Sequence, residues 1–243
     1  MILGILQARC GSTRLPGKVL KPILGRPMLA YQIERLRRAS ALDDLIVATS
    51  TEVADGAIAE LCTALGLPCF RGSHADVLDR FYRAASSHGA EHVARFTGDC
   101  PLADPGVVDH VIGTHLEQGN DYTSNALERT YPDGLDVEVF RYSCLEEAWR
   151  EAELPSQREH VTPYFYGNPE RFRLGSVRRE TDLSGHRWAV DEPADFRLVT
   201  AIFEALYPKN EAFSTADVLA LLDRRPDLVQ LNRHADGSTE GGG

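Results

Sequence analysis

The chain has 243 residues, with 26 lysines and arginines against 36 aspartates and glutamates, and therefore a formal net charge of −10. Hydrophobic residues make up 43% and charged residues 26%, a balance typical of globular proteins that excludes disorder of the whole chain. The acidic charge argues against general binding to nucleic acids or to anionic membranes, because phosphate groups attract basic surfaces. A locally basic pocket for one small anion stays compatible with it.

Signals for membranes and for oxidised compartments are missing from the sequence. No stretch approaches the roughly 18 apolar residues of a membrane span, and the N-terminus does not have the pattern of a secretion signal. The five cysteines form no C-x-x-C motif, and their odd number suggests neither a disulfide framework nor a zinc site. These features predict a cytoplasmic protein with reduced thiols.

The first half of the chain alternates apolar runs with helical patterns. Strands are predicted at residues 2–6, 45–50, 68–70 and 92–97. Helices are predicted at residues 29–36, 54–65, 75–87 and 105–118. This alternation predicts a parallel α/β sheet with right-handed crossovers. Ligands of such sheets bind where the carboxyl ends of the strands meet the loops.

The second half is less regular. Val137 and Val139 alternate with charged residues, which predicts a half-exposed strand. A short strand is predicted at 187–190, and Ser214 with Asp217 forms a capping box that opens the last helix. Further helices are predicted at residues 143–152, 158–167 and 193–206, and Pro226 ends the last one. Because no repeat or linker is found, residues 1–234 are predicted to form one domain, followed by a disordered tail at residues 235–243.

The loop after the first strand concentrates positive charge. Arg9, Arg14 and Lys18 lie within ten residues of one another, together with Gly11 and Gly17. Glycine lets backbone N–H groups approach phosphate oxygens, and the cations supply charge and hydrogen-bond donors, so the loop predicts a polyphosphate site. The alternative is a solvated basic loop. The spacing is not that of a Walker A loop, and no G-x-G-x-x-G follows the strand, which disfavours ATPases and dehydrogenases.

The segment QARCGSTRLPGK (7–18) resembles the signature of the cytidylyltransferases that make CMP-activated acidic sugars, the CMP-Kdo and CMP-sialic acid synthetases. The resemblance is strongest to the branch of spore coat polysaccharide biosynthesis protein F. Five further blocks resemble that branch in the same order, at residues 72–80 (GSHADVLDR), 95–102 (RFTGDCPL), 131–140 (YPDGLDVEVF), 158–164 (REHVTPY) and 188–196 (WAVDEPADF). The resemblance implies a three-layer α/β/α nucleotide-diphospho-sugar transferase fold, which is Rossmann-like with a mostly parallel sheet.

The reaction implied by the resemblance is transfer of CMP from CTP to an acidic sugar or a related acceptor, with release of pyrophosphate, for surface polysaccharide biosynthesis. Such an enzyme is a nucleotidyltransferase that uses Mg²⁺, and the resemblance also implies a homodimer. In this reaction Arg9, Arg14 and Lys18 would hold the triphosphate and stabilise the leaving pyrophosphate. The resemblance assigns nucleotide binding to Ala8, Gly11, Ser12, Arg71, Ser73, Asp76 and Arg80. Asp76 or Arg80 could instead form an ordinary helix pair.

Two carboxylates are the candidate metal ligands. Asp99 follows the strand at 92–97, and Asp191 follows the short strand predicted at 187–190. Taken alone, Asp99 could be a turn former or a helix cap, and Asp191 could be an N-cap. The resemblance identifies both with the Mg²⁺ ligands of the family, and two carboxylates with phosphate oxygens and water are sufficient for that ion.

The candidate acceptor site consists of Asp136, Glu138 and His160. The two carboxylates are two residues apart on a predicted strand, so both should point to one face. They could bind sugar hydroxyls or an amine, or could lie on a solvated strand edge. His160 precedes Tyr164 by one turn of a predicted helix and could be structural, while the resemblance favours the substrate pocket.

Cys10 lies inside the loop, where Arg9 could acidify its thiol, although an inert small residue is the simpler interpretation. Other functions also fit parts of the pattern. A glycosyltransferase that uses an activated sugar would share the sheet but usually has a D-x-D motif, and Asp99-Cys100-Pro101 has no second aspartate. A non-catalytic regulatory subunit and a cytidylyltransferase for a phosphorylated non-sugar acceptor are the remaining alternatives.

Overall fold

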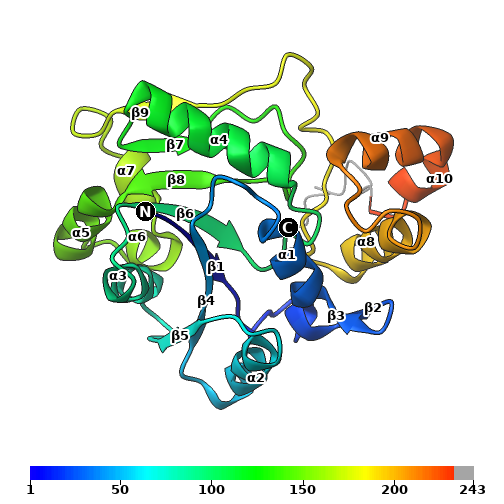
Figure 1. Cartoon of the computed structure of the whole chain (residues 1–243), viewed down its shortest axis with the longest axis horizontal. Coiled ribbons are helices and arrows are strands. Elements are labelled where there is room, and N and C mark those ends of the chain that lie inside the picture. Colours follow the sequence, from blue (N-terminus) through cyan, green and yellow to red (C-terminus); the bar gives the residue numbers. More distant parts are fainter. Residues whose placement is uncertain (233–243) are drawn as a thin grey trace, which may run out of the picture.

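The computed structural model describes residues 1–232 and has a seven-stranded sheet in the order β5-β4-β1-β6-β8-β7-β9 (Figure 1). The strands are β1 Ile2–Gln7, β4 Asp44–Ser50, β5 Cys69–Gly72, β6 His92–Thr97, β7 Tyr122–Ser124, β8 Glu138–Arg141 and β9 Leu174–Ser176. A small antiparallel pair, β2 Pro22–Ile23 and β3 Arg26–Pro27, lies outside the sheet. Only β8 runs against its neighbours, so the sheet is mostly parallel as predicted.

Helices cover both faces of the sheet. They are α1 Met28–Leu36, α2 Gly56–Ala64, α3 Val77–Ser87, α4 Pro105–Gln118, α5 Tyr142–Glu151, α6 Pro155–His160, α7 Pro163–Tyr166, α8 Pro193–Leu206, α9 Thr215–Arg224 and α10 Pro226–Val229. Two short 3₁₀ helices are η1 Lys18–Leu20 and η2 Val53–Asp55. The arrangement confirms the predicted three-layer α/β/α fold (Figure 1). Within residues 1–232 no helix has the length and apolar character that crossing a membrane requires.

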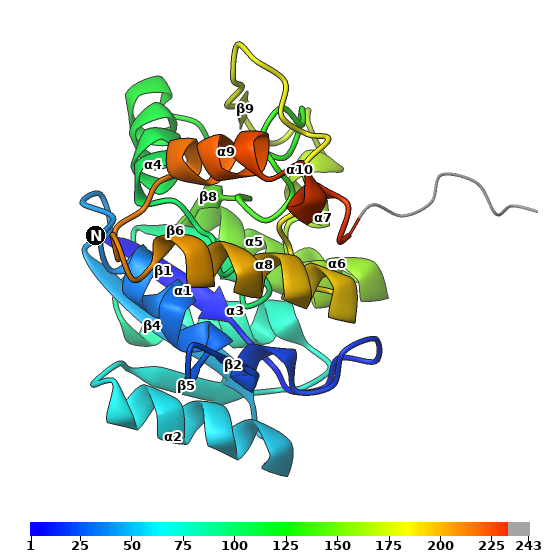
Figure 2. The same ribbon diagram turned by 90° about the vertical axis from the view of Figure 1, so that its right-hand side faces the viewer.

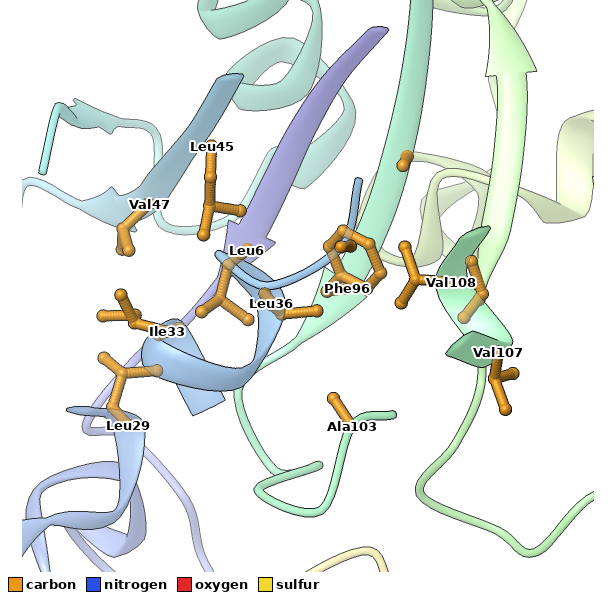
Figure 3. Close-up of a cluster of buried hydrophobic side chains, with 14 of the residues drawn as sticks. Leu6, Leu29, Ile33, Leu36, Leu45, Val47, Phe96, Ala103, Val107 and Val108 are labelled. Atoms are coloured by element: carbon orange, nitrogen blue, oxygen red, sulfur yellow. The ribbon is translucent and has the colours of Figure 1, made fainter. Parts of the chain in front are cut away.

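The core is divided by the sheet into two layers. On one face, Leu6 and Phe96 of the central strands pack against Ile33 of α1 and Val108 of α4, as Figure 3 shows. The opposite face packs against α3, α5 and α7, where Phe81 is fully buried. Apolar residues on both sides of a parallel strand explain why β1 and β4 read as continuous apolar runs in the sequence.

A third apolar cluster joins the C-terminal helices to α1. Phe203 of α8 contacts the ring of Tyr31 on α1 at a centroid distance of 4.7 Å, and Trp188 is buried in the same cluster. Figure 2 shows α8 and α9 side by side in front of the sheet. The predicted capping box is confirmed, because Ser214 and Asp217 bond each other's backbone N–H at the start of α9. Pro226 ends α9 and opens α10.

Several elements of the second half differ from the sequence predictions. Strands β7 and β9 were not predicted, because three residues give too short a pattern to recognise. The strand predicted around Val137 and Val139 exists as β8, but it lies between β6 and β7, and both valines are buried. The expectation of a half-exposed strand was therefore wrong.

The strand predicted at 187–190 does not form. Only Arg187 makes a bridge, to Asp133, and the segment runs across the ends of the strands instead of joining the sheet. The carbonyl of Asp133 holds the backbone of this segment by accepting hydrogen bonds from the N–H groups of Trp188 and Ala189, at 2.6 and 3.0 Å. Burial of this segment beneath α8 explains the apolar pattern that suggested a strand.

The helix predicted at 158–167 is also wrong, because it is interrupted between α6 and α7. Val161 is fully buried and adopts φ 68° and ψ −62°, and the N–H of Thr162 donates to the carbonyl of His160 at 2.8 Å, which makes a γ-turn. Pro163 cannot donate a hydrogen bond, and its ring would clash with the carbonyl of Glu159 in a continuous helix. His160 and Tyr164 therefore belong to different helices.

The domain boundary at residue 234 and the tail predicted at 235–243 lie outside the described residues. The single-domain organisation stays a prediction.

Gly134 fixes the turn that carries the segment 187–190. It has φ 106°, and a Cβ atom there would lie 2.5 Å from the nitrogen of Ala189. We expect Gly134→Ala to lower the free energy of unfolding by about 2 kcal/mol or more, because φ strain and a backbone clash add. Urea unfolding measures the loss, with Gly185→Ala as the control, since Gly185 has no atom within 4 Å of an added Cβ. Equal unfolding midpoints for the two variants would contradict the prediction.

Candidate active site

A cavity of about 470 Å³ opens at the carboxyl edge of the sheet, where the loops after β1 and β6 approach α3 and α6. Ten of the predicted site residues line it: Ala8, Arg9, Gly11, Ser12, Arg14, Lys18, Arg80, Asp99, His160 and Asp191. Five others do not: Arg71, Ser73, Asp76, Asp136 and Glu138. The structure thus brings the candidate phosphate and metal groups together at one cavity, which most of the remaining candidates do not line.

Lys18 is the centre of the cavity's charge network. Its ammonium group donates to Asp99 Oδ2 at 3.1 Å, to Asp191 Oδ1 at 2.9 Å and to the carbonyl oxygen of Val190 at 2.7 Å. The Lys18 side chain is only 11% exposed. A charge so far from water is stable only when it is paired and hydrogen-bonded, and here three oxygens satisfy its three donors.

The Asp99 carboxylate is ionised in this environment. Burial would raise its pKa, but the charge of Lys18 and hydrogen bonds from Thr97 and Lys18 outweigh burial and hold the pKa below its ordinary value. Asp191 also pairs with Arg14 at 3.0 Å and with Arg187 at 3.5 Å. Two carboxylates therefore converge on the ammonium group of Lys18.

This donor set fits a hard divalent cation. Mg²⁺ commonly takes one or two carboxylate oxygens and fills its other positions with water and phosphate oxygens. Asp99 and Asp191 supply two such groups from segments that both end at the cavity. Neither aspartate caps a helix: Asp104 caps α4, and Glu192 caps α8. The capping alternatives for both residues were therefore wrong.

The first loop is held to the sheet by backbone contacts. The N–H of Cys10 donates to Asp55 Oδ1 at 2.7 Å, and the N–H of Gly17 donates to the carbonyl of Cys10 at 3.0 Å. Gly98 lets the turn after β6 approach this loop, because a Cβ atom there would lie 3.0 Å from Ala8 Cβ. The loop and the Asp99 turn are consequently fixed against each other.

Arg80 is the most buried of the predicted nucleotide-binding residues, with 1% exposure. Its Nη1 donates to the carbonyl of Ser73 at 2.9 Å, and its Nε has no partner among the described residues. Burial, followed by the charge of Arg9, lowers its pKa to about 10, so it remains a cation at neutral pH. It presents an unused donor at the cavity wall.

The other nucleotide-binding candidates make structural contacts in the loops around β5. Arg71 donates to the carbonyls of Ser50 and Glu52, at 3.0 and 2.8 Å. Asp76 caps α3 and binds Arg158, with 3.0 Å to its Nε. The alternative that Asp76 and Arg80 form a helix pair was wrong, because their side chains have other partners.

The three acceptor candidates lie in different environments. Asp136 precedes β8 and pairs with Arg129 at 3.0 Å, and burial, partly offset by Arg129, raises its pKa. Glu138 pairs with Arg95 and accepts a hydrogen bond from Tyr122 at 2.7 Å. The solvated strand edge was therefore the wrong alternative, since both carboxylates have buried surroundings and separate cations. His160 lines the cavity at the end of α6.

Sequence reasoning missed eight lining residues: Gln7, Thr13, Val19, Val77, Arg95, Thr97, Gly98 and Glu159. Arg95 carried a usable signal, because a single cation interrupts the apolar pattern of strand 92–97. A charge inside a strand buried on both faces requires a partner or a ligand. Glu159, which lies 3.8 Å from Arg9, had no such signal in its polar helix.

The fold and the basic residues of the first loop are those of an α/β nucleotidyltransferase. Comparisons with known proteins agree with this class. The family profile described as Cytidylyltransferase matches residues 3–219. Spore coat polysaccharide biosynthesis protein SpsF of Bacillus subtilis is 34% identical over 244 residues, covering 97% of this chain and 99% of that protein. The 3-deoxy-manno-octulosonate cytidylyltransferase of Nitratidesulfovibrio vulgaris is 38% identical over 114 residues, covering 45% of this chain and 44% of that protein.

A solved structure of a cytidylyltransferase from Leptospira borgpetersenii superimposes with a TM-score of 0.91 at 31% identity, covering 96% of this chain and 98% of that one. The chain belongs to the cytidylyltransferase family. The family membership and the α/β fold implied by the sequence resemblance are thus confirmed.

The thiol of Cys10 has a raised pKa, and not the lowered one that Arg9 could have produced. Burial and the neighbouring Asp55 carboxylate raise the pKa of its thiol to about 11. We expect iodoacetamide at pH 8 to alkylate Cys10 about a hundredfold more slowly than a free cysteine, because the thiolate is the reactive form. Mass spectrometry of the Cys10 peptide over time measures the rate, with Cys10→Ser as the assignment control. A rate close to that of free cysteine would show that the loop acidifies the thiol.

Proposed function

We propose that this protein is a Mg²⁺-dependent cytidylyltransferase that transfers CMP from CTP to an acidic sugar or a related acceptor. The observation that carries the proposal is the convergence of Lys18, Asp99 and Asp191 beside a basic loop at the carboxyl edge of the sheet. Family membership supports the use of CTP, and the names of the relatives support a role in surface polysaccharide biosynthesis.

In the proposed reaction an acceptor hydroxyl oxygen forms a bond to the α-phosphorus of CTP and gives up its proton to water. The bond between the α-phosphorus and the oxygen bridging to the β-phosphorus breaks, and pyrophosphate leaves. Arg9, Arg14 and Lys18 stabilise the charge on the triphosphate and on the leaving group, Lys18 through its charge because its three donors already bond protein oxygens. Backbone amides near Gly11 and Ser12 supply fixed dipoles. Mg²⁺, when bound by Asp99 and Asp191, supplies charge that neutralises phosphate oxygens.

Nucleotide binding in this proposal involves Ala8, Gly11, Ser12 and Arg80 at the cavity wall. Ser73 supports this wall because its carbonyl accepts a hydrogen bond from Arg80, while Arg71 and Asp76 hold the neighbouring loops. Binding of the acceptor involves His160, which lines the cavity near α3. A homodimer and a cytoplasmic location stay predictions, the first of which sedimentation tests.

The metal role of the two aspartates can be separated from nucleotide binding. We expect Asp99→Asn and Asp191→Asn to lower pyrophosphate release from CTP by at least about a hundredfold, because each removes a carboxylate that would hold the Mg²⁺ ion. Calorimetry in EDTA should give the same CTP affinity for the variants and the wild type. Adding MgCl₂ should strengthen CTP binding in the wild type only.

The matched control is Asp182→Asn, at an exposed aspartate whose side chain hydrogen-bonds the nearby Ser184 within residues 1–232. It should behave as the wild type in both assays. Normal turnover by Asp99→Asn would contradict the metal site. Tight binding of a UDP- or GDP-sugar by a protein that ignores CTP would instead favour the glycosyltransferase alternative.

A further inference from the structure

A row of polar side chains crosses the sheet next to the cavity. Gln7 of β1, Arg95 of β6, Glu138 of β8 and Tyr122 of β7 come from four consecutive strands, and Arg95 lies directly opposite Glu138 in the ladder. Alternating residues of the same strands pack against α3 and α5, so the row lies on that face. It borders the apolar core towards the carboxyl ends of the strands.

The row is fully connected by hydrogen bonds. Arg95 Nε donates to Gln7 Oε1 at 3.2 Å, and Arg95 Nη1 pairs with Glu138 Oε2. The other oxygen of Glu138 accepts from the hydroxyl of Tyr122 at 2.7 Å. The side chains of Arg95 and Glu138 are 11% and 13% exposed. Both Glu138 oxygens are therefore occupied, and the carboxylate holds the guanidinium in one orientation.

Arg95 still has donors that no group of the described residues uses. It lines the cavity, and within residues 1–232 no hydrogen bond is made by its Nη2. Glu138 does not line the cavity, so only the cationic member of the pair faces it. A fixed guanidinium with free N–H groups binds oxyanions well, because its donors match two oxygens and lose little freedom on binding.

The position of Arg95 in the sheet separates it from the nucleotide-binding candidates around β5, while Ala8, Gly11, Ser12 and Arg80 line the same cavity as Arg95. Arg71, Ser73 and Asp76 lie at or after β5, and three strand spacings separate β5 from β6, or about 14 Å. Arg95 instead lies on the side of the sheet that carries β8. Burial raises the pKa of Tyr166. The charges of Glu138 and Arg95 also act on this pKa, so Tyr166 lies close to this side as well.

We propose that Arg95 is an oxyanion subsite for the acceptor and that Glu138 is a positioning residue that holds Arg95. The inference rests on the proposed function and identifies the acceptor as an anion, either a carboxylate or a phosphate. It reassigns Glu138, for which the sequence predicted direct contact with the acceptor.

The test uses pyrophosphate release with CTP and Mg²⁺ and four acceptors: 3-deoxy-manno-octulosonate, N-acetylneuraminate, glucose 1-phosphate and neutral glucose. Turnover should be confined to anionic acceptors, and either the acids or the phosphate should be preferred, which identifies the group. We expect Arg95→Gln to raise the KM for the preferred acceptor about 10- to 100-fold, the range for a lost hydrogen bond to a charged group. CTP affinity by calorimetry should stay within twofold.

Two further variants distinguish positioning from direct contact. Glu138→Gln should raise the same KM by less than Arg95→Gln does. The double variant Arg95→Gln/Glu138→Gln leaves no unpaired buried charge, and should have the KM of Arg95→Gln alone, because Glu138 acts through Arg95. Arg178→Gln is the matched control, since Arg178 is exposed and pairs with exposed Glu128.

Several outcomes would overturn the subsite. These are turnover of glucose with a similar KM, turnover of no anionic acceptor by a protein that binds CTP, an unchanged KM in Arg95→Gln, and additive effects in the double variant. A parallel loss of CTP affinity and acceptor KM would assign Arg95 to the nucleotide or to folding. Failure of the wild type to bind CTP would overturn the proposed function itself, so the two failures are distinguishable.

Discussion

The ammonium group of Lys18 joins three segments that are far apart in the sequence. It contacts Asp99, 81 residues away, and both Val190 and Asp191, more than 170 residues away. Removing one partner of such a buried charge group leaves the others uncompensated, which costs more than the group contributes when intact. The cluster therefore fixes the first loop, the turn after β6 and the segment before α8 relative to one another.

The surroundings of this cluster explain how an acidic protein can bind an anion. The chain has a net charge of −10, yet Arg9, Arg14, Arg80 and Arg95 all line one cavity. Arg80 and Arg95 are largely buried, so their charges act through a lower dielectric than they would on the surface. Local arrangement, more than total charge, sets the electrostatics that a ligand meets. The γ-turn at Val161 adds backbone strain beside His160, at the rim of the same cavity.

Much of the fold could be predicted from periodicity in the first half of the chain. The apolar runs of β1 and β4 and the amphipathic pattern of α3 are long enough to be unambiguous. Strands and helices alternate along this half, as in a parallel sheet. The second half resisted prediction for physical reasons. Strand β9 has only three residues, and segment 187–190 is apolar because α8 covers it, with no strand beside it to pair with.

The sequence by itself identified the family, the cationic residues of the first loop and the two candidate metal-binding aspartates. These features depend on residue types in a local order. Only the tertiary structure decided which charges meet. The pairing of Glu138 with Arg95, the pairing of Asp136 with Arg129 and the burial of Arg80 depend on strand order and on which face each side chain occupies. Neighbours across a sheet come from distant parts of the chain, so no local pattern encodes their contacts.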